Sequence, residues 1–204
     1  MKKTLPILAL IYFLFTACEE AYYPDPLQPW TPAYTTEGVN TAGAKINGQR
    51  WITNSDCNFV NGCNTEMDIR AYSANREANL PDSTVIRFIG ADNSIISFNF
   101  SDMLVTSPDD LLALEGTEYT LGSSQVIGTY QESPFEELAC LPQSQTGKLF
   151  IRYVQEKITN NRRTVIFSGT FGFDYLSNEC GEVSVHSGRF DFKVYPDNIF
   201  LEPR

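Results

Sequence analysis

The chain has 204 residues, with 25 acidic residues against 15 Lys and Arg, so its formal net charge at pH 7 is −10. This acidic surplus argues against nucleic acid and against anionic membrane surfaces as partners, because both are negatively charged and attract Lys and Arg side chains. At this length we expect one domain with a substantial core, and no second domain is needed.

The first residues have the pattern of a secretory signal. Lys2 and Lys3 precede an apolar run from Leu5 to Phe15, and small residues follow. The run is too short to span a bilayer, which needs about 20 apolar residues. The alternative is a buried N-terminal strand or helix, but the polar, Pro-rich sequence that follows offers it nothing to pack against.

Residues 15–18, Phe-Thr-Ala-Cys, resemble the lipobox of bacterial lipoproteins, with Phe15 where Leu is usual. The resemblance implies that a signal peptide of residues 1–17 is removed and that Cys18 is acylated. Several buried acyl chains would then anchor the protein firmly to a membrane. Removal of 17 of the 204 residues leaves 187, and the net charge falls from −10 to −12 because Lys2 and Lys3 are lost and no acidic residue is.

The cysteine count agrees with export. Besides Cys18 there is an even number of cysteines, which in an oxidising compartment suggests two disulfides. These cysteines are Cys57, Cys63, Cys140 and Cys180. Three pairings are possible, and we favour Cys57–Cys63, which closes a Gly-containing loop, together with Cys140–Cys180. A four-cysteine zinc site typically contains close C-x-x-C pairs, and the sequence has none.

Residues 18–42 are predicted to form a tether. The segment has no hydrophobic periodicity and is rich in proline, which favours extended polyproline II at about 3.1 Å per residue. Its aromatic side chains can dock on the domain, lie at a membrane interface or bind a partner. They are Tyr22, Tyr23, Trp30 and Tyr34.

From Gly43 onward the chain has period-two alternation with frequent turn signals, which predicts antiparallel strands in a single domain of residues 43–204. Strands at 44–46 and 50–52 flank Asn47-Gly48, a strong hairpin signal. Further strands are predicted at residues 67–73, 84–90, 94–100, 118–121, 126–130, 148–155, 164–175 and 182–195.

The strand predicted at 182–195 contains a change of phase. Its apolar positions are Val183 and Val185 and then Phe190 and Phe192, and Ser187-Gly188 lies between the two pairs. A β-bulge there adds one residue and returns the same face of the strand to the core.

One short helix is expected near residues 108–115. Ser107 can cap it, Pro108 fits its first position, and Asp109 and Asp110 suit its positive end. Many short strands without βαβ alternation predict an all-β fold, either an antiparallel β-sandwich or an open barrel of about 8–10 strands.

Four short motifs occur in order along the chain. They are Ala44-Lys45-Ile46-Asn47-Gly48-Gln49-Arg50-Trp51, Gly128-Thr129-Tyr130, Phe167-Ser168-Gly169-Thr170-Phe171 and Ser187-Gly188-Arg189-Phe190. Together they resemble a lipoprotein domain family of unknown function from Bacteroidota. The resemblance covers about residues 43–195 and implies a β-sandwich-like fold and an envelope location, but no catalytic residues.

No catalytic constellation is visible. A Ser–His pair needs a histidine, and His186, the only one, alternates with Val185, which predicts that it faces solvent or a sheet edge. Glu66 and Asp68 approach the E-x-D-x-x-E strand of laminarinase-like glycosidases, but the second catalytic Glu is missing. A cross-strand or same-face ion pair is the favoured interpretation. We expect a protein that is not an enzyme and that has no cofactor and no metal site.

These observations favour a non-catalytic binding module for a glycan or a protein, anchored through Cys18 in the cell envelope, in the outer membrane, on either its periplasmic or its surface face. The alternative is an accessory or structural subunit of an envelope complex, and a carbohydrate-active hydrolase is a remote one. Three or more Tyr or Trp on one concave face would favour a ligand. An exposed apolar patch or an unpaired sheet edge would favour a subunit.

Overall fold

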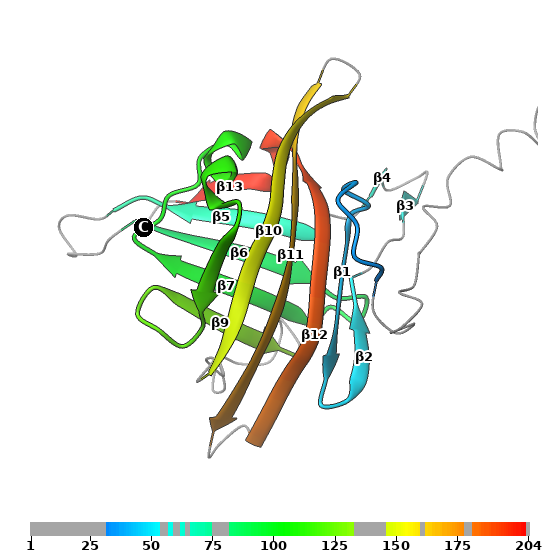
Figure 1. The fold of residues 1–204 in the computed structure, drawn as a ribbon, viewed down its shortest axis with the longest axis vertical. Coiled ribbons are helices and arrows are strands. Elements are labelled where there is room, and N and C mark those ends of the chain that lie inside the picture. The colour runs from blue at the N-terminus through cyan, green and yellow to red at the C-terminus, as the bar shows by residue number, and fades with distance from the viewer. Residues whose placement is uncertain are drawn as a thin grey trace, which may run out of the picture.

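Figure 1 shows a computed structural model of the chain, which describes the β domain and the segment just before it. The described residues are 32–53, 57–58, 62–63, 66–74, 82–132, 146–159, 162–177 and 181–202. The predicted signal peptide, Cys18 and the tether up to residue 31 lie outside this range, as do Cys140 and Cys180.

Two β-sheets pack against each other, so the predicted all-β fold is confirmed (Figure 1). The six-stranded sheet has the order β2-β1-β12-β11-β10-β8 and is antiparallel. Its strands are β1 (Thr41–Ile46), β2 (Gln49–Ile52), β8 (Thr117–Thr120), β10 (Thr146–Thr159), β11 (Arg162–Ser177) and β12 (Gly181–Val194).

The five-stranded sheet has the order β13-β5-β6-β7-β9, with one parallel pair, β13 and β5. Its strands are β5 (Met67–Tyr72), β6 (Ser83–Ile89), β7 (Ile95–Ser101), β9 (Val126–Gln131) and β13 (Ile199–Glu202). The sequence did not predict β13, nor the small separate ladder of β3 (Cys57–Asn58) and β4 (Gly62–Cys63). Among the described residues, no helix is long and apolar enough to cross a membrane.

The strands of the two sheets cross each other, and the sheets join at one corner (Figure 1). Beyond the end of β2, Thr53 forms a bridge with Gly90, and the Ala91 N–H donates to the Ile52 carbonyl at 3.0 Å. A strand that passes from one sheet to the other in this way makes the corner of an orthogonal sandwich.

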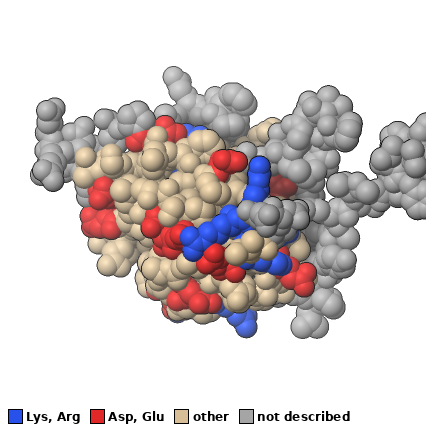
Figure 2. All heavy atoms as spheres, turned by 90° about the horizontal axis from the view of Figure 1, so that it is seen from above, with Lys and Arg blue, Asp and Glu red and all other residues tan. Residues whose placement is uncertain are grey.

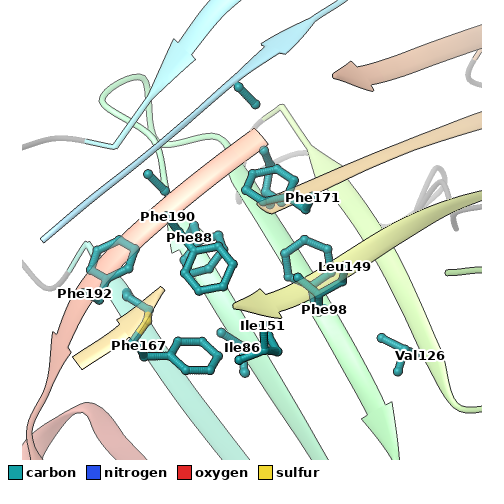
Figure 3. Packing of buried hydrophobic residues seen from close by; sticks show 14 of the residues in the cluster. Ile86, Phe88, Phe98, Val126, Leu149, Ile151, Phe167, Phe171, Phe190 and Phe192 are labelled. Carbon is teal, nitrogen blue, oxygen red and sulfur yellow. The ribbon is translucent and has the colours of Figure 1, made fainter. Parts of the chain in front are cut away.

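Phenylalanine side chains fill the space between the sheets (Figure 3). Phe88 from β6 is fully buried, and its ring centroid lies 5.3 Å from that of Phe192 and 5.1 Å from that of Phe190, both on β12. Phe98 from β7 meets the ring of Phe171 on β11 edge to face at 5.3 Å. Burying such a side chain stabilises the fold by about 1.5–3 kcal/mol.

The predicted bulge at Ser187-Gly188 is confirmed on both sides of β12. Against β11 the partner of Phe171 is Gly188 and that of Phe173 is Val185, so two residues of β12, His186 and Ser187, oppose one residue of β11. Against β1 the register shifts in the same place, between Gly43 and Lys45. The extra residue keeps the apolar side chains of both halves of β12 in the core.

The Asn47-Gly48 hairpin also forms as predicted. Both residues have positive φ, 51° and 81°, which the two-residue turn between β1 and β2 requires. The hairpin brings Trp51 into the core, where its indole N–H donates to the Ser94 hydroxyl at 2.6 Å. Two of the four sequence motifs therefore have a structural role: residues 44–51 form the β1–β2 hairpin, and residues 187–190 include the bulge of β12.

The predicted helix is the 3-10 helix η1 (Pro108–Leu114), and a second 3-10 turn, η2 (Pro196–Asn198), precedes β13. Ser107 is the N-cap residue of η1, as expected, but its side chain makes no capping hydrogen bond. Instead the Asp110 carboxylate accepts the N–H groups of Thr106 and Ser107, at 2.8 and 2.9 Å, and both of their hydroxyls. Burial acts to raise the pKa of Asp110, but these hydrogen bonds outweigh it and lower the pKa.

Buried tyrosines predict how the domain responds to alkali. Burial raises the pKa of Tyr119, Tyr130 and Tyr175 above the ordinary 10.0, and in Tyr175 the negative charges of Tyr130 and Glu132 raise it further. A raised pKa means that the folded state favours the neutral phenol, so this stabilisation is complete below pH 10 and is lost as the pH rises above it.

In an alkaline titration we expect some of the 10 tyrosines to ionise only as the domain unfolds. Tyrosinate absorbance and tryptophan fluorescence should therefore change together above pH 10. Ionisation of every tyrosine near pH 10 in a domain that stays folded would contradict this expectation.

Candidate functional site

The outer face of the six-stranded sheet carries a hollow of about 580 Å³, called here the outer hollow. On β10, Lys148 and Phe150 face outward on either side of buried Leu149, and on β11, Thr170, Gly172 and Asp174 alternate with core residues. Side chains from four strands surround the outer hollow, among them Glu118, Lys148, Phe150, Asp174, His186 and Arg189.

The bulge and a glycine shape the outer hollow. Gly172 lies beside the bulge, where a side chain would otherwise project from the middle of β11. Ser187 and Gly188 of the bulge line the adjoining wall. The bulge of β12, which the phase change in the sequence predicts, therefore keeps apolar side chains in the core and also helps to form the outer hollow.

Charges of both signs line the outer hollow. The Lys148 ammonium is 2.6 Å from the Glu118 carboxylate across β8 and β10, and both side chains are largely exposed. Exposed pairs of this kind are worth at most about 1 kcal/mol to stability. They leave a surface that can offer both hydrogen-bond donors and acceptors to a ligand.

His186 lies at the outer hollow with 60% of its side chain exposed, so the prediction that it faces solvent is confirmed. The Ser184 hydroxyl bonds both to His186 Nε2 and to Asp174 Oδ1, and Asp174 Oδ1 lies 3.6 Å from the same Nε2. A Ser–His–Asp relay needs the carboxylate on the opposite ring nitrogen, Nδ1. The arrangement is therefore a surface hydrogen-bond cluster and lacks the geometry of a catalytic triad.

Residues 32–40, called here the strap, lie against the outer face next to the outer hollow. The buried Asp191 carboxylate on β12 accepts the backbone N–H groups of Glu37 at 3.1 Å and Gly38 at 3.0 Å, and a hydroxyl from Thr35. Ser168 on β11 donates to the same carboxylate at 2.5 Å. A ring of backbone donors around one carboxylate compensates its charge without a cation.

Two further contacts hold the strap and bring it to the rim of the outer hollow. The Arg152 guanidinium lies 4.5 Å from the centroid of the Tyr34 ring, a cation–π contact. Arg189, which lines the outer hollow, donates to the Pro32 carbonyl at 3.4 Å. Of the aromatic residues in the predicted tether, Tyr34 is the one within the described residues, and it docks on the domain.

Asp68 on β5 forms the cross-strand ion pair that the sequence favours, and Glu66 lies just before this strand. The Arg87 guanidinium on β6 makes two hydrogen bonds to Asp68 on β5, at 2.7 and 2.5 Å, and the two residues are register partners. Arg70 lies 3.7 Å from Asp68 and 3.3 Å from Glu202 on β13. Because Asp68 is buried and engaged in this way, its role is structural.

The cysteines are described only in part. The backbones of Cys57 and Cys63 pair directly across β3 and β4, which suits the pairing favoured from the sequence. Their side chains, and all of Cys18, Cys140 and Cys180, lie outside the described residues, so the lipidation and disulfide assignments stay predictions. Within the described residues, no group of three His, Cys, Asp or Glu side chains is placed to hold a metal ion.

No Tyr or Trp side chain lines the outer hollow among the residues that the structure describes. The stacking surface that would favour a glycan is therefore missing there. No protein-family model, no curated protein sequence and no solved structure matches this chain. The resemblance carried by the four motifs accordingly remains a prediction.

Proposed function

We propose that this chain is an exported lipoprotein, anchored in the cell envelope through Cys18, whose β domain is a non-catalytic module that binds a polypeptide partner at the outer hollow. The observation that carries the proposal is the hollow itself, about 580 Å³ on an outer sheet face. Concave sites of this size, with a few convergent polar groups, are the usual places for ligands.

The lining favours a polypeptide over other ligands. Lys148, Arg189 and His186 can donate hydrogen bonds, while Glu118 and Asp174 can accept them, which suits a backbone with alternating N–H and C=O groups. Phe150 supplies an apolar contact in their midst. The strap supports the proposal as well, because it is a peptide segment that already lies on this same face.

The accessory-subunit alternative has an observation of its own. β13 is an edge strand, and its Phe200 and Leu201 side chains are 43% and 66% exposed. An exposed strand edge can pair with another chain. In that case the partner would contact β13 and would leave the outer hollow open.

Photo-crosslinking in living cells distinguishes these surfaces. We expect a photoreactive amino acid at position 148, on the rim of the outer hollow, to capture a defined protein that mass spectrometry identifies. The matched control at position 99, an exposed residue on β7 of the other sheet, should not capture it. A third probe at position 201 reports on β13.

Capture from position 201 but not from position 148 would favour the alternative function, an accessory subunit that binds its partner through β13. The same proteins from 148 and 99, or none from any position, would overturn it. In the latter case, a glycan bound by the purified protein and lost in the Phe150→Ala variant would make the ligand a carbohydrate.

A further inference from the structure

The hairpin of β10 and β11 extends beyond the rest of its sheet. β8 stops pairing with β10 at Ile151, and β12 stops pairing with β11 at Val165, so residues 157–159 and 162–164 pair with each other alone in the described ladders. Figure 1 shows this hairpin rising above the other strands. Three residues past Val165, at about 3.3 Å each, carry it ~10 Å beyond β12.

The end of this hairpin combines exposed basic residues with an exposed apolar one. Ile158 is 71% exposed, the most among the described large hydrophobic residues. Lys157 and Arg162 are exposed, and no described acidic side chain pairs with either of them. Arg163 bridges to Asp109 of η1 at 2.7 Å and to Glu156 of its own hairpin.

This composition contrasts with the rest of an acidic protein. The formal net charge is −10, yet the hairpin end has three basic side chains against two acids, Glu156 and Asp109 of η1. Both acids bind Arg163, so Lys157 and Arg162 remain as the local positive surplus. Figure 2, which looks down on this end of the molecule, shows basic side chains gathered near the centre of the face with acidic ones around them. At physiological salt, charges interact over about 8 Å, so a projecting hairpin partly escapes the negative field of the body.

We propose that the hairpin end, made of Lys157, Ile158, Arg162 and Arg163, contacts an anionic lipid surface. Lys157 and Arg162 lie on one face of the hairpin, and Ile158 and Arg163 lie on the other. The hairpin would therefore approach the membrane end-on, with the basic side chains among the headgroups and Ile158 at their boundary with the acyl chains. The described part of the hairpin end is two strands wide and exposes one large apolar side chain, Ile158, which offers too little area for a specific protein interface. A lipid surface, by contrast, deforms around such a tip.

The inference extends the proposed function, because a tethered domain meets the membrane at high local concentration. The 14 residues from Cys18 to residue 31 span roughly 40 Å when extended, so the anchor leaves the hairpin free to reach the lipid surface. The hairpin would then turn the domain to a preferred orientation over the membrane.

The test uses an artificial tether, so that it does not depend on acylation of Cys18. Residues 19–204, with a hexahistidine tag in place of Cys18, are held on vesicles by a nickel-chelating lipid. An environment-sensitive fluorescent amino acid at position 158 should shift its emission to the blue on phosphatidylcholine vesicles that contain phosphatidylglycerol. The shift should be absent on pure phosphatidylcholine and should disappear at high salt.

Charge reversal separates a local contact from an effect of net charge. Lys157→Glu with Arg162→Glu should lower the docked fraction about tenfold. Lys45→Glu with Arg50→Glu, on the β1–β2 hairpin, changes the net charge equally and should leave the shift intact. An unchanged emission on anionic vesicles, or equal loss in both double variants, would overturn the inference. A separate experiment determines acylation of Cys18 by mass spectrometry of the N-terminal peptide of the native protein. A failure of the proposed anchor can then be distinguished from a failure of the hairpin to contact lipid.

Discussion

Replacing Phe88 by alanine is expected to lower the free energy of unfolding by about 3–5 kcal/mol. The side chain is fully buried and contacts rings from both sheets: Phe98 on β7 at 6.0 Å, Phe171 on β11 at 6.0 Å, and Phe190 and Phe192 on β12. Removing it leaves a cavity at the interface of the sheets, and the crossed strands around it cannot easily collapse to fill the space.

Chemical denaturation of residues 19–204 measures this loss, and two variants serve as controls. Phe88→Leu keeps most of the volume and should cost about 1–2 kcal/mol. Phe200→Ala removes the same ring from β13, where it is 43% exposed, and should cost less than about 1 kcal/mol. If Phe88→Ala were no more harmful than Phe200→Ala, the two sheets would not share the core that Figure 3 shows.

The antiparallel strands could be predicted because each has one buried face. In β11, core residues from Val165 to Tyr175 alternate with outward residues, and this local pattern is visible in the sequence. The bulge was predictable for the same reason, since a change of phase at Ser187-Gly188 has only a few structural solutions. β13 escaped prediction because Ile199, Phe200 and Leu201 do not alternate and the strand pairs in parallel with distant β5.

The candidate site was much less predictable, because it depends on neighbours that are far apart in the sequence. The outer hollow unites Glu118, Lys148, Asp174 and Arg189 from four strands, and nothing local marks them as a group. The strap has no hydrophobic periodicity, so it resembles a free tether. Asp191 alternates with Phe190 and Phe192 as the exposed Asp174 alternates with Phe173 and Tyr175, so its sequence neighbours do not indicate that a segment covers it.

The second large effect is expected at Asp191. Its carboxylate accepts hydrogen bonds from strap residues that lie more than 150 positions earlier in the chain, and it is 2% exposed. Asp191→Ala removes the acceptor shared by Thr35, Glu37 and Gly38 and should lower the free energy of unfolding by about 2–4 kcal/mol. The cost has an upper limit, because a released strap can satisfy its N–H groups with water.

Hydrogen exchange shows whether the strap itself is released. In Asp191→Ala, the amides of Glu37, Gly38 and Val39 should exchange much faster, while those in the centre of β11 should keep most of their protection. Asp110→Asn is the matched control, because Asp110 also accepts backbone N–H groups, but from residues three and four positions before it on an exposed turn.

That control should cost about 1 kcal/mol and leave the strap amides protected. Persistent protection of the strap in Asp191→Ala would mean that Tyr34 and Arg152, together with the Asn40 side chain on the Lys193 N–H, are enough to hold it. Faster exchange of the strap amides would instead show that Asp191 is the residue that holds the strap on the β domain. The Pro32 carbonyl accepts a hydrogen bond from Arg189, which lines the outer hollow. Release of the strap would therefore also remove this contact from Arg189.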